Sequence, residues 1–188
     1  MSEPITIVSG LPRSGTSMMM SMLQAGGMDL LTDNERKADI DNPRGYFEFE
    51  RVKKVKEDPS WLKDTGGRAV KMVARLLYDL PEDLEYQVIF MKRNMQEMLL
   101  SQDKMLDRLG KPRGDVPDVR MAGLFAKELA AVEGWLRTRD NMRVLYVDYG
   151  EVVARPEDAA ERIYDFIIPK LDVRPMAGVV DEGLYRNR

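Results

Sequence analysis

The segment from Gly10 to Ser17 constrains the fold of this chain more than any other stretch. It follows an apolar, β-type run over residues 5–9 and leads into a helical pattern over residues 16–25, so it predicts a strand, a tight loop and a helix in succession. Gly10 and Gly15 allow the backbone to turn sharply. The first amides of such a helix point toward an anion and carry the positive end of the helix dipole. The segment therefore predicts a site for a phosphate-like group.

The spacing of the two glycines matches the nucleotide-binding P-loop, but the residue types do not. That motif requires a lysine directly after its second glycine, where this chain has Thr16. The cation stands earlier, at Arg13. A P-loop enzyme also needs an acid after a second strand to hold magnesium, whereas the run over residues 88–91 is followed by Lys92 and Arg93. We therefore expect an anion site that works without a metal.

A second candidate element follows the predicted strand over residues 88–91. Arg93 ends this strand, and Ser101 comes eight residues later, two turns into a predicted helix, so the two side chains together can bind a second anion. Combined with the loop, this element resembles the sulfotransferase family, whose donor is 3′-phosphoadenosine 5′-phosphosulfate. The resemblance implies that the loop binds the 5′-phosphosulfate and that Arg93 and Ser101 bind the 3′-phosphate.

Further segments extend this resemblance in the family's order. Residues 41–48 look like a segment of bacterial members, residues 144–153 look like the family's late strand and turn, and residues 184–188 look like its tail. The resemblance implies an α/β, three-layer, P-loop NTPase-like fold with a central parallel sheet. Residues 1–188 would then form a single sulfotransferase-like domain.

The pattern of apolar residues also predicts an α/β layered domain, because β-type runs alternate with helical ones. The polar stretches 28–65 and 110–119 are expected to border the site, since ligands of such folds lie at the carboxyl ends of the strands. The predicted strands span residues 5–9, 69–73, 88–91 and 143–147, and the predicted helices span residues 16–25, 74–80, 94–109, 120–140 and 156–167.

The composition limits the partners of the chain and the residue types that can transfer protons. The chain has 188 residues, a net charge of −3, no cysteine and no histidine. A dedicated nucleic-acid binder would carry a basic surplus, so we expect no nucleic-acid partner and only a local positive patch. Proton transfer falls to carboxylates, lysine or tyrosine. The N-terminus shows no leader and no apolar run is long enough to span a bilayer, so we expect a cytoplasmic protein with no membrane span.

The candidate donor-binding residues come from the loop, from the second element and from the tail. Thr16 and Ser17 can also cap the helix, which is compatible with binding. In the family a late basic segment covers the 3′-phosphate, so the resemblance adds Arg186. The candidates are Arg13, Ser14, Gly15, Thr16, Ser17, Arg93, Ser101 and Arg186, and the donor implied is 3′-phosphoadenosine 5′-phosphosulfate without a metal.

The candidate catalytic residues are two cations and one carboxylate. Arg13 and Lys71 are expected to stabilise charge on the transferring group; Lys71 interrupts an apolar run, and family members carry a lysine on that strand. Glu35 lies about twenty residues beyond Arg13, where glycosaminoglycan and tyrosine-protein sulfotransferases place a catalytic glutamate, so the resemblance selects it first as the base. Glu48 and Asp41 are close rivals for that role.

The methionines after the loop and the carboxylate of Glu97 are given structural roles. The methionines over residues 18–22 are interpreted as core filler, because flexible thioethers at helical spacing suit a core. Glu97 is expected to face solvent or to pair with Lys104 or Arg93.

The sequence thus predicts a sulfotransferase that transfers a sulfuryl group by in-line displacement to a hydroxyl or amine of a small molecule or glycan. Two alternatives stay open: a P-loop nucleotide kinase that uses ATP and magnesium, and a nucleotide-binding module without catalysis. Thr16 and the Lys92–Arg93 pair argue against the kinase. The sequence does not indicate the acceptor or the oligomeric state.

Overall fold

The computed structural model describes residues 3–33, 45–110, 117–181 and 183. Within these residues, the centre is a four-stranded sheet with the order β2-β1-β3-β4, and all neighbouring strands are parallel. β1 spans Ile5–Gly10, β2 Ala69–Lys71, β3 Tyr86–Lys92 and β4 Met142–Asp148. Parallel strands need connections that cross a face of the sheet, and helices supply most of them here.

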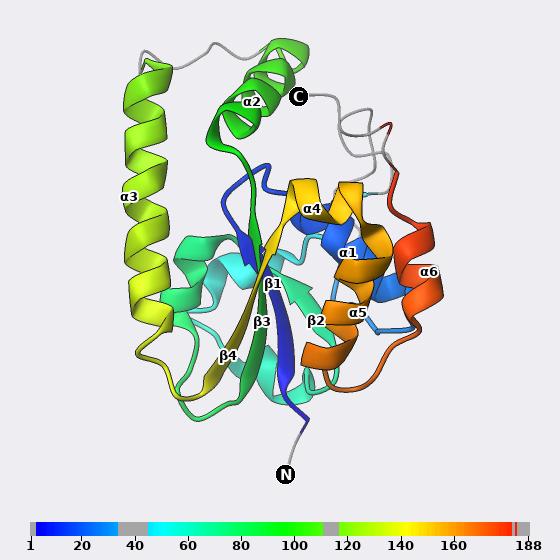
Figure 1. The fold of residues 1–188 in the computed structure, drawn as a ribbon. Helices are drawn as coiled ribbons and strands as arrows, with labels where there is room; N and C mark the ends of the chain where they lie inside the picture. The colour runs from blue at the N-terminus through cyan, green and yellow to red at the C-terminus, as the bar shows by residue number, and fades with distance from the viewer. Residues whose placement is uncertain (1–2, 34–44, 111–116, 182, 184–188) are drawn as a thin grey trace.

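Helices lie on both faces of the sheet (Figure 1). α1, α5 and α6 cover one face, α3 covers the other, and α2 lies beyond the carboxyl ends of the strands. No helix in the described part of the chain is long and apolar enough to cross a membrane. The α-helices are α1 (Thr16–Ala25), α2 (Met95–Arg108), α3 (Asp118–Leu136), α4 (Tyr149–Ala154), α5 (Pro156–Phe166) and α6 (Val173–Gly178), and the 3-10 helices are η1 (Glu50–Lys54), η2 (Ser60–Asp64) and η3 (Ala74–Asp79).

The side chains of the sheet alternate between two apolar cores, one on each face. Ile89 and Met91 of β3 pack with α1, α5 and α6, whereas Val88 and Phe90 pack with α3 and the 3-10 helices. All four are completely buried. Successive side chains of a strand point to opposite faces, so this pattern marks a sheet covered on both sides. The three-layer α/β fold expected from the sequence is confirmed.

The methionine cluster of α1 belongs to one of these cores. Met19, Met20 and Met22 are completely buried and pack against α6 and the sheet. Their unbranched side chains fill the space between a helix and two neighbouring elements. The interpretation as core filler is confirmed for these three methionines, whereas Met18 is only partly buried and lines the cavity described below.

Some local predictions differ from the structure. β2 ends at Lys71, two residues before the predicted end, because the chain leaves the sheet after the Met72 amide donates to the Val8 carbonyl. The helix predicted over residues 74–80 is the 3-10 helix η3, which Pro81 keeps short. The stretch 28–65, expected to be a loop, contains η1 and η2. α4 and α6 were not predicted, since six residues are too few to show a helical period.

The order of the strands opens a crevice at the carboxyl ends of β1 and β3. From β1 the chain passes first to β2 on one side and later to β3 on the other side. Connections that leave a strand in opposite directions create such a crevice, and ligands of α/β proteins bind there. The Gly10–Ser17 segment follows β1 and Arg93 follows β3, so the fold brings both predicted anion-binding elements to this crevice.

α2, which carries Ser101, depends on a cap at its start. The Asn94 side chain accepts hydrogen bonds from the Gln96 and Glu97 amides at 2.9 and 3.3 Å. We expect Asn94→Ala to lower the free energy of unfolding by about 1 kcal/mol, because both amides lose their partner. Urea denaturation measures the change, and Asn94→Asp, which keeps the acceptor oxygen, is the control. An alanine variant as stable as the parent would contradict this role of the cap.

Candidate active site

A cavity of about 550 Å³ lies at the carboxyl ends of the strands. The loop between β1 and α1, the segment around residues 46–53 and helix α2 contribute to its walls. The described residues that line it carry six cations and two carboxylates, although the whole chain has a net charge of −3. Such a local positive patch suits an anionic ligand. The cations are Arg13, Lys53, Lys71, Arg93, Lys104 and Arg108, and the carboxylates are Glu48 and Asp181.

Two glycines shape the loop between β1 and α1. Gly10 has a φ of 153°, and a Cβ atom there would lie 2.5 Å from Ser14 Oγ and 2.7 Å from the Met91 carbonyl oxygen. Gly15 has a φ of 99°, and a Cβ atom there would lie 2.4 Å from the Tyr149 ring. Both glycines have a left-handed backbone, and neither site has room for a side chain. The loop therefore packs directly against β3 and the start of α4.

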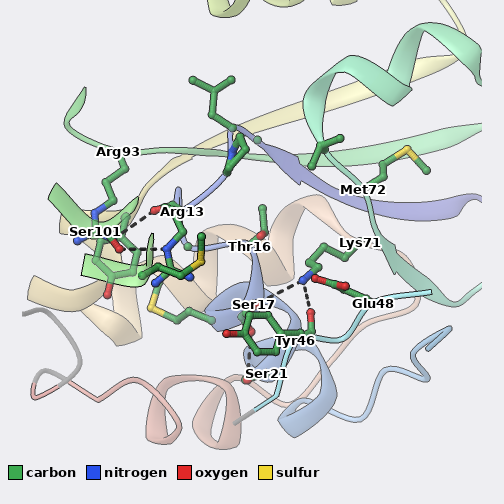
Figure 2. A pocket seen from close by; sticks show the side chains of 18 of the residues that line it. Arg13, Thr16, Ser17, Ser21, Tyr46, Glu48, Lys71, Met72, Arg93 and Ser101 are labelled. Carbon is green, nitrogen blue, oxygen red and sulfur yellow. Dashed lines mark hydrogen bonds between the residues drawn. The ribbon is translucent and has the colours of Figure 1, made fainter. Parts of the chain in front are cut away.

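Arg13 joins the two predicted anion-binding elements. Its φ of 68° is uncommon for a residue with a side chain. Its Nε donates to Ser101 Oγ of α2 at 3.0 Å, and its carbonyl oxygen accepts from Arg93 Nη1 at 3.3 Å. The sequence analysis assigned Arg13 to donor binding and to the transferring group; its guanidinium lies on the Ser101 side of the cavity (Figure 2). The two elements thus form one connected cluster.

Arg93 is held between a carboxylate and an aromatic ring. Its Nε lies 3.0 Å from Glu97 Oε2, and the two side chains are only 8% and 15% exposed. Its guanidinium carbon lies 4.2 Å from the centre of the Tyr149 ring. Burial raises the pKa of Tyr149, so this ring stays neutral and provides a favourable surface for a cation. The sequence analysis named Arg93 as one of the residues with which Glu97 could pair, and the structure shows this pair.

Lys71 lies on the other side of the start of α1. Its Nζ donates to Ser17 Oγ at 3.4 Å and to the Tyr46 carbonyl oxygen. All three residues line the cavity. The lysine that interrupts an apolar run therefore ends its strand facing the cavity, and Figure 2 shows Glu48 beside it.

The segment that carries Glu48 is hydrogen-bonded to residues 32–33. The Glu48 carbonyl accepts hydrogen bonds from Thr32 Oγ1 at 2.9 Å and from the Asp33 amide at 3.1 Å. The Asp33 carboxylate in turn accepts from the Glu50 amide at 2.6 Å. Together with the bond from Lys71 to the Tyr46 carbonyl, these contacts hold the backbone on both sides of Glu48 at the cavity.

The structure brings most of the candidate residues to this one cavity. Ser14 is an exception, because it is 1% exposed, its Oγ lies under Gly10 and its amide donates to the Leu11 carbonyl. Glu35, Asp41 and Arg186 lie outside the described residues. The candidates that line the cavity are Arg13, Gly15, Thr16, Ser17, Glu48, Lys71, Arg93 and Ser101.

The sequence analysis missed further charged or aromatic residues at the cavity, including Lys53, Lys104, Arg108, Tyr149 and Asp181. Lys104 and Arg108 follow Ser101 by three and seven residues, so helical spacing places all three on one face of α2 and could have revealed them. Tyr149 belongs to a segment that carried the family resemblance, but its contacts with Gly15 and Arg93 join three distant parts of the chain. No pattern of neighbouring residues in the sequence predicts such contacts.

Comparison with known proteins identifies the family. The sequence matches the model of the sulfotransferase domain over residues 3–182. This chain belongs to the sulfotransferase family. A search of curated proteins finds no significant match.

The fold of this sulfotransferase is similar to a solved structure described as the sulfotransferase domain from the curacin biosynthetic pathway. The two are 16% identical with a TM-score of 0.55, over 97% of this chain and 89% of that chain. A sugar kinase from Janibacter sp. HTCC2649 has 12% identity and a TM-score of 0.42, over 95% of this chain and 99% of that chain. A gluconokinase from Sinorhizobium meliloti 1021 has 15% identity and a TM-score of 0.36, over 94% of this chain and 91% of that chain.

Gly15 offers a direct test of the loop geometry. We expect Gly15→Ala to lower the free energy of unfolding by at least about 1 kcal/mol, because alanine is strained in the left-handed region and its Cβ would overlap the Tyr149 ring. Chemical denaturation measures the change.

Gly134→Ala is the matched control, since Gly134 lies inside α3 with open space around it. The same substitution there should raise stability by up to about 1 kcal/mol. Equal effects at the two positions would contradict the proposed packing of Tyr149 against the loop.

Proposed function

We propose that this sulfotransferase transfers a sulfuryl group from 3′-phosphoadenosine 5′-phosphosulfate to an acceptor hydroxyl or amine. The observation that carries this proposal is the arrangement of two groups of side chains around the start of α1 (Figure 2). Arg13, Arg93 and Ser101 lie on one side and suit a nucleotide phosphate. Lys71 and Glu48 lie on the other side and suit the chemistry of transfer.

The residues present fit a donor with two separate anionic groups. Arginine binds phosphate through a planar fork of N–H groups, and the connected cluster of Arg13, Arg93 and Ser101 contains two such forks and a hydroxyl. The first amides of α1 suit the second anionic group, because the first N–H groups of a helix lack partners inside it. Gly10 and Gly15 allow the loop to pack against β3 and Tyr149, since a Cβ atom at either position would overlap these neighbours.

The donor supplies a sulfonate group attached to a phosphate that can leave. The acceptor atom forms a bond to sulfur while the bond from sulfur to the bridging oxygen breaks, and that electron pair stays on the departing adenosine 3′,5′-bisphosphate. Lys71, held at the cavity by Ser17 and Tyr46, stabilises the negative charge that develops on the oxygens. Fixed charges and positioning thus provide the catalysis, as they do in phosphoryl transfer.

The acceptor's proton passes to a carboxylate. Glu48 has structural support for this role, because it lines the cavity beside Lys71 and its segment is fastened at both ends. Glu35 is supported by the family resemblance alone, and Asp41 by its place in the same stretch of sequence. We therefore propose Glu48 as the base and keep Glu35 as the alternative.

Arg93 tests the donor assignment. We expect Arg93→Ala to weaken binding of adenosine 3′,5′-bisphosphate by about 1.5–3 kcal/mol, roughly 10- to 150-fold, because a charged hydrogen bond to the 3′-phosphate is lost. AMP, which lacks that phosphate, should bind equally well to both proteins. Calorimetry with the two nucleotides separates this effect from a general loss of stability.

A surface arginine provides the control for this measurement. Arg155 pairs with Asp158 on the surface, and both side chains are more than half exposed, so Arg155→Ala should leave both affinities unchanged. Equal losses of AMP and bisphosphate binding in the Arg93 variant would refute the assignment of Arg93 to the 3′-phosphate.

Glu48 tests the assignment of the base. We expect Glu48→Gln to slow sulfuryl transfer to a hydroxyl acceptor by roughly 100- to 10,000-fold, because glutamine keeps the size of the side chain but accepts no proton. Binding of the bisphosphate should not change. Glu35→Gln and Asp41→Asn are the comparison variants, measured in single-turnover assays. A large loss in the Glu35 variant, with normal transfer by the Glu48 variant, would move the role of base to Glu35.

A further inference from the structure

Apolar side chains that follow Glu48 and Lys71 in the sequence line the cavity, and we call them its apolar wall. The wall comes from the segment around residues 49–52 and from the chain that runs from the end of β2 into η3. Val52 and Met72 are almost completely buried in the core that the sheet shares with α3 and the 3-10 helices. The Phe49 ring packs edge-on against Trp61, with the ring centres 5.2 Å apart. The wall is therefore fixed by the core behind it. Its members are Phe49, Val52, Met72, Val73 and Leu76.

Val73 is exposed on the cavity side although it is apolar. It is 46% exposed, and among the large exposed hydrophobic residues in the described part of the chain it is the one that lines the cavity. An isolated exposed valine on a convex surface needs no explanation. An exposed valine in a concave site, next to four other apolar side chains, is typical of a surface that contacts a ligand.

The five wall residues carry apolar side chains, and among the described residues the polar side chains on this side come from neighbouring positions of the chain. Among the described residues that line this side, Lys71 binds Ser17 and the Tyr46 carbonyl, and Glu48 lies beside it. The Lys53 ammonium lies 2.6 Å from the Glu50 carboxylate. A sugar ring against this wall would lose water from most of its hydroxyls without gaining hydrogen bonds in return, and this is costly. The wall favours hydrocarbon.

We propose that the acceptor is an alcohol or phenol with an apolar body that packs against this wall. Its hydroxyl lies toward Glu48 and Lys71, gives its proton to Glu48, and becomes a sulfate ester as the bond from sulfur to the bridging oxygen breaks. This inference rests on the proposed function, and it names the class of acceptor. Sugars and glycans are the class that it excludes.

A series of 4-alkylphenols, from 4-methylphenol to 4-pentylphenol, provides the test. Binding to the whole chain is measured by calorimetry, both without nucleotide and with saturating adenosine 3′,5′-bisphosphate. We expect the affinity to rise about fourfold for each added methylene until the wall is covered, as for burial of hydrocarbon. Methyl glucoside serves as the sugar probe and should not bind measurably.

Two matched valine variants locate the binding. Val73→Gln should weaken binding of 4-pentylphenol at least several-fold and flatten the dependence on chain length. Val119→Gln is the control, because Val119 is 87% exposed near the start of α3 and does not line the cavity, so this variant should bind like the parent. Thermal unfolding checks that both variants remain folded.

The outcomes separate this inference from the proposed function. Normal binding of the bisphosphate with a flat alkylphenol series, or with tighter binding of methyl glucoside, would overturn the acceptor class and leave the donor assignment standing. Equal losses in the two valine variants would also overturn it. A rising series that depends on Val73, in a protein that fails to bind the bisphosphate, would support the apolar site and refute the donor.

Discussion

The contact between the Tyr149 ring and the loop at Gly15 is the constraint on which the rest of the site depends. A Cβ atom at Gly15 would lie 2.4 Å from this ring, and Arg93 stacks on the same ring at 4.2 Å. The ring therefore touches the loop after β1 and the residue after β3, and it stands itself at the end of β4. Three parallel strands deliver these segments to one edge of the sheet, and the ring fixes how they meet there.

Burial of Tyr149 affects charge as well as packing. Burial raises the pKa of its hydroxyl, so the ring adds no negative charge to a cavity suited to anions. The charge of Arg93 is balanced by Glu97 in a pair that is mostly shielded from water. With Glu97 at Nε and the Arg13 carbonyl at Nη1, the plane of the guanidinium is set before any ligand arrives. Such preorganisation lowers the entropy lost when a phosphate binds.

The sequence predicted those features that depend on local pattern. Strand and helix periods predicted the layered fold, and the Gly10–Ser17 and Arg93–Ser101 spacings pointed to two elements that meet at the cavity. It could not predict that Arg13 turns toward Ser101, because that direction goes with a left-handed backbone that no neighbouring residue demands. It could not predict that Glu48 lies at the cavity either, because hydrogen bonds from residues fifteen and sixteen positions away hold its backbone in place.

Lys71 lies between Ser17 of the loop and the apolar wall, and in the proposed mechanism this position couples acceptor binding to charge stabilisation. Electrostatic interactions strengthen as water leaves a site, because the local dielectric constant falls. An apolar acceptor body that covers Met72 and Phe49 removes water from the neighbourhood of Lys71 and Glu48, whereas a hydrated sugar would bring water in. In the proposed mechanism the apolar wall therefore raises the rate of transfer as well as the affinity, since the charge on Lys71 acts most strongly when the acceptor is in place.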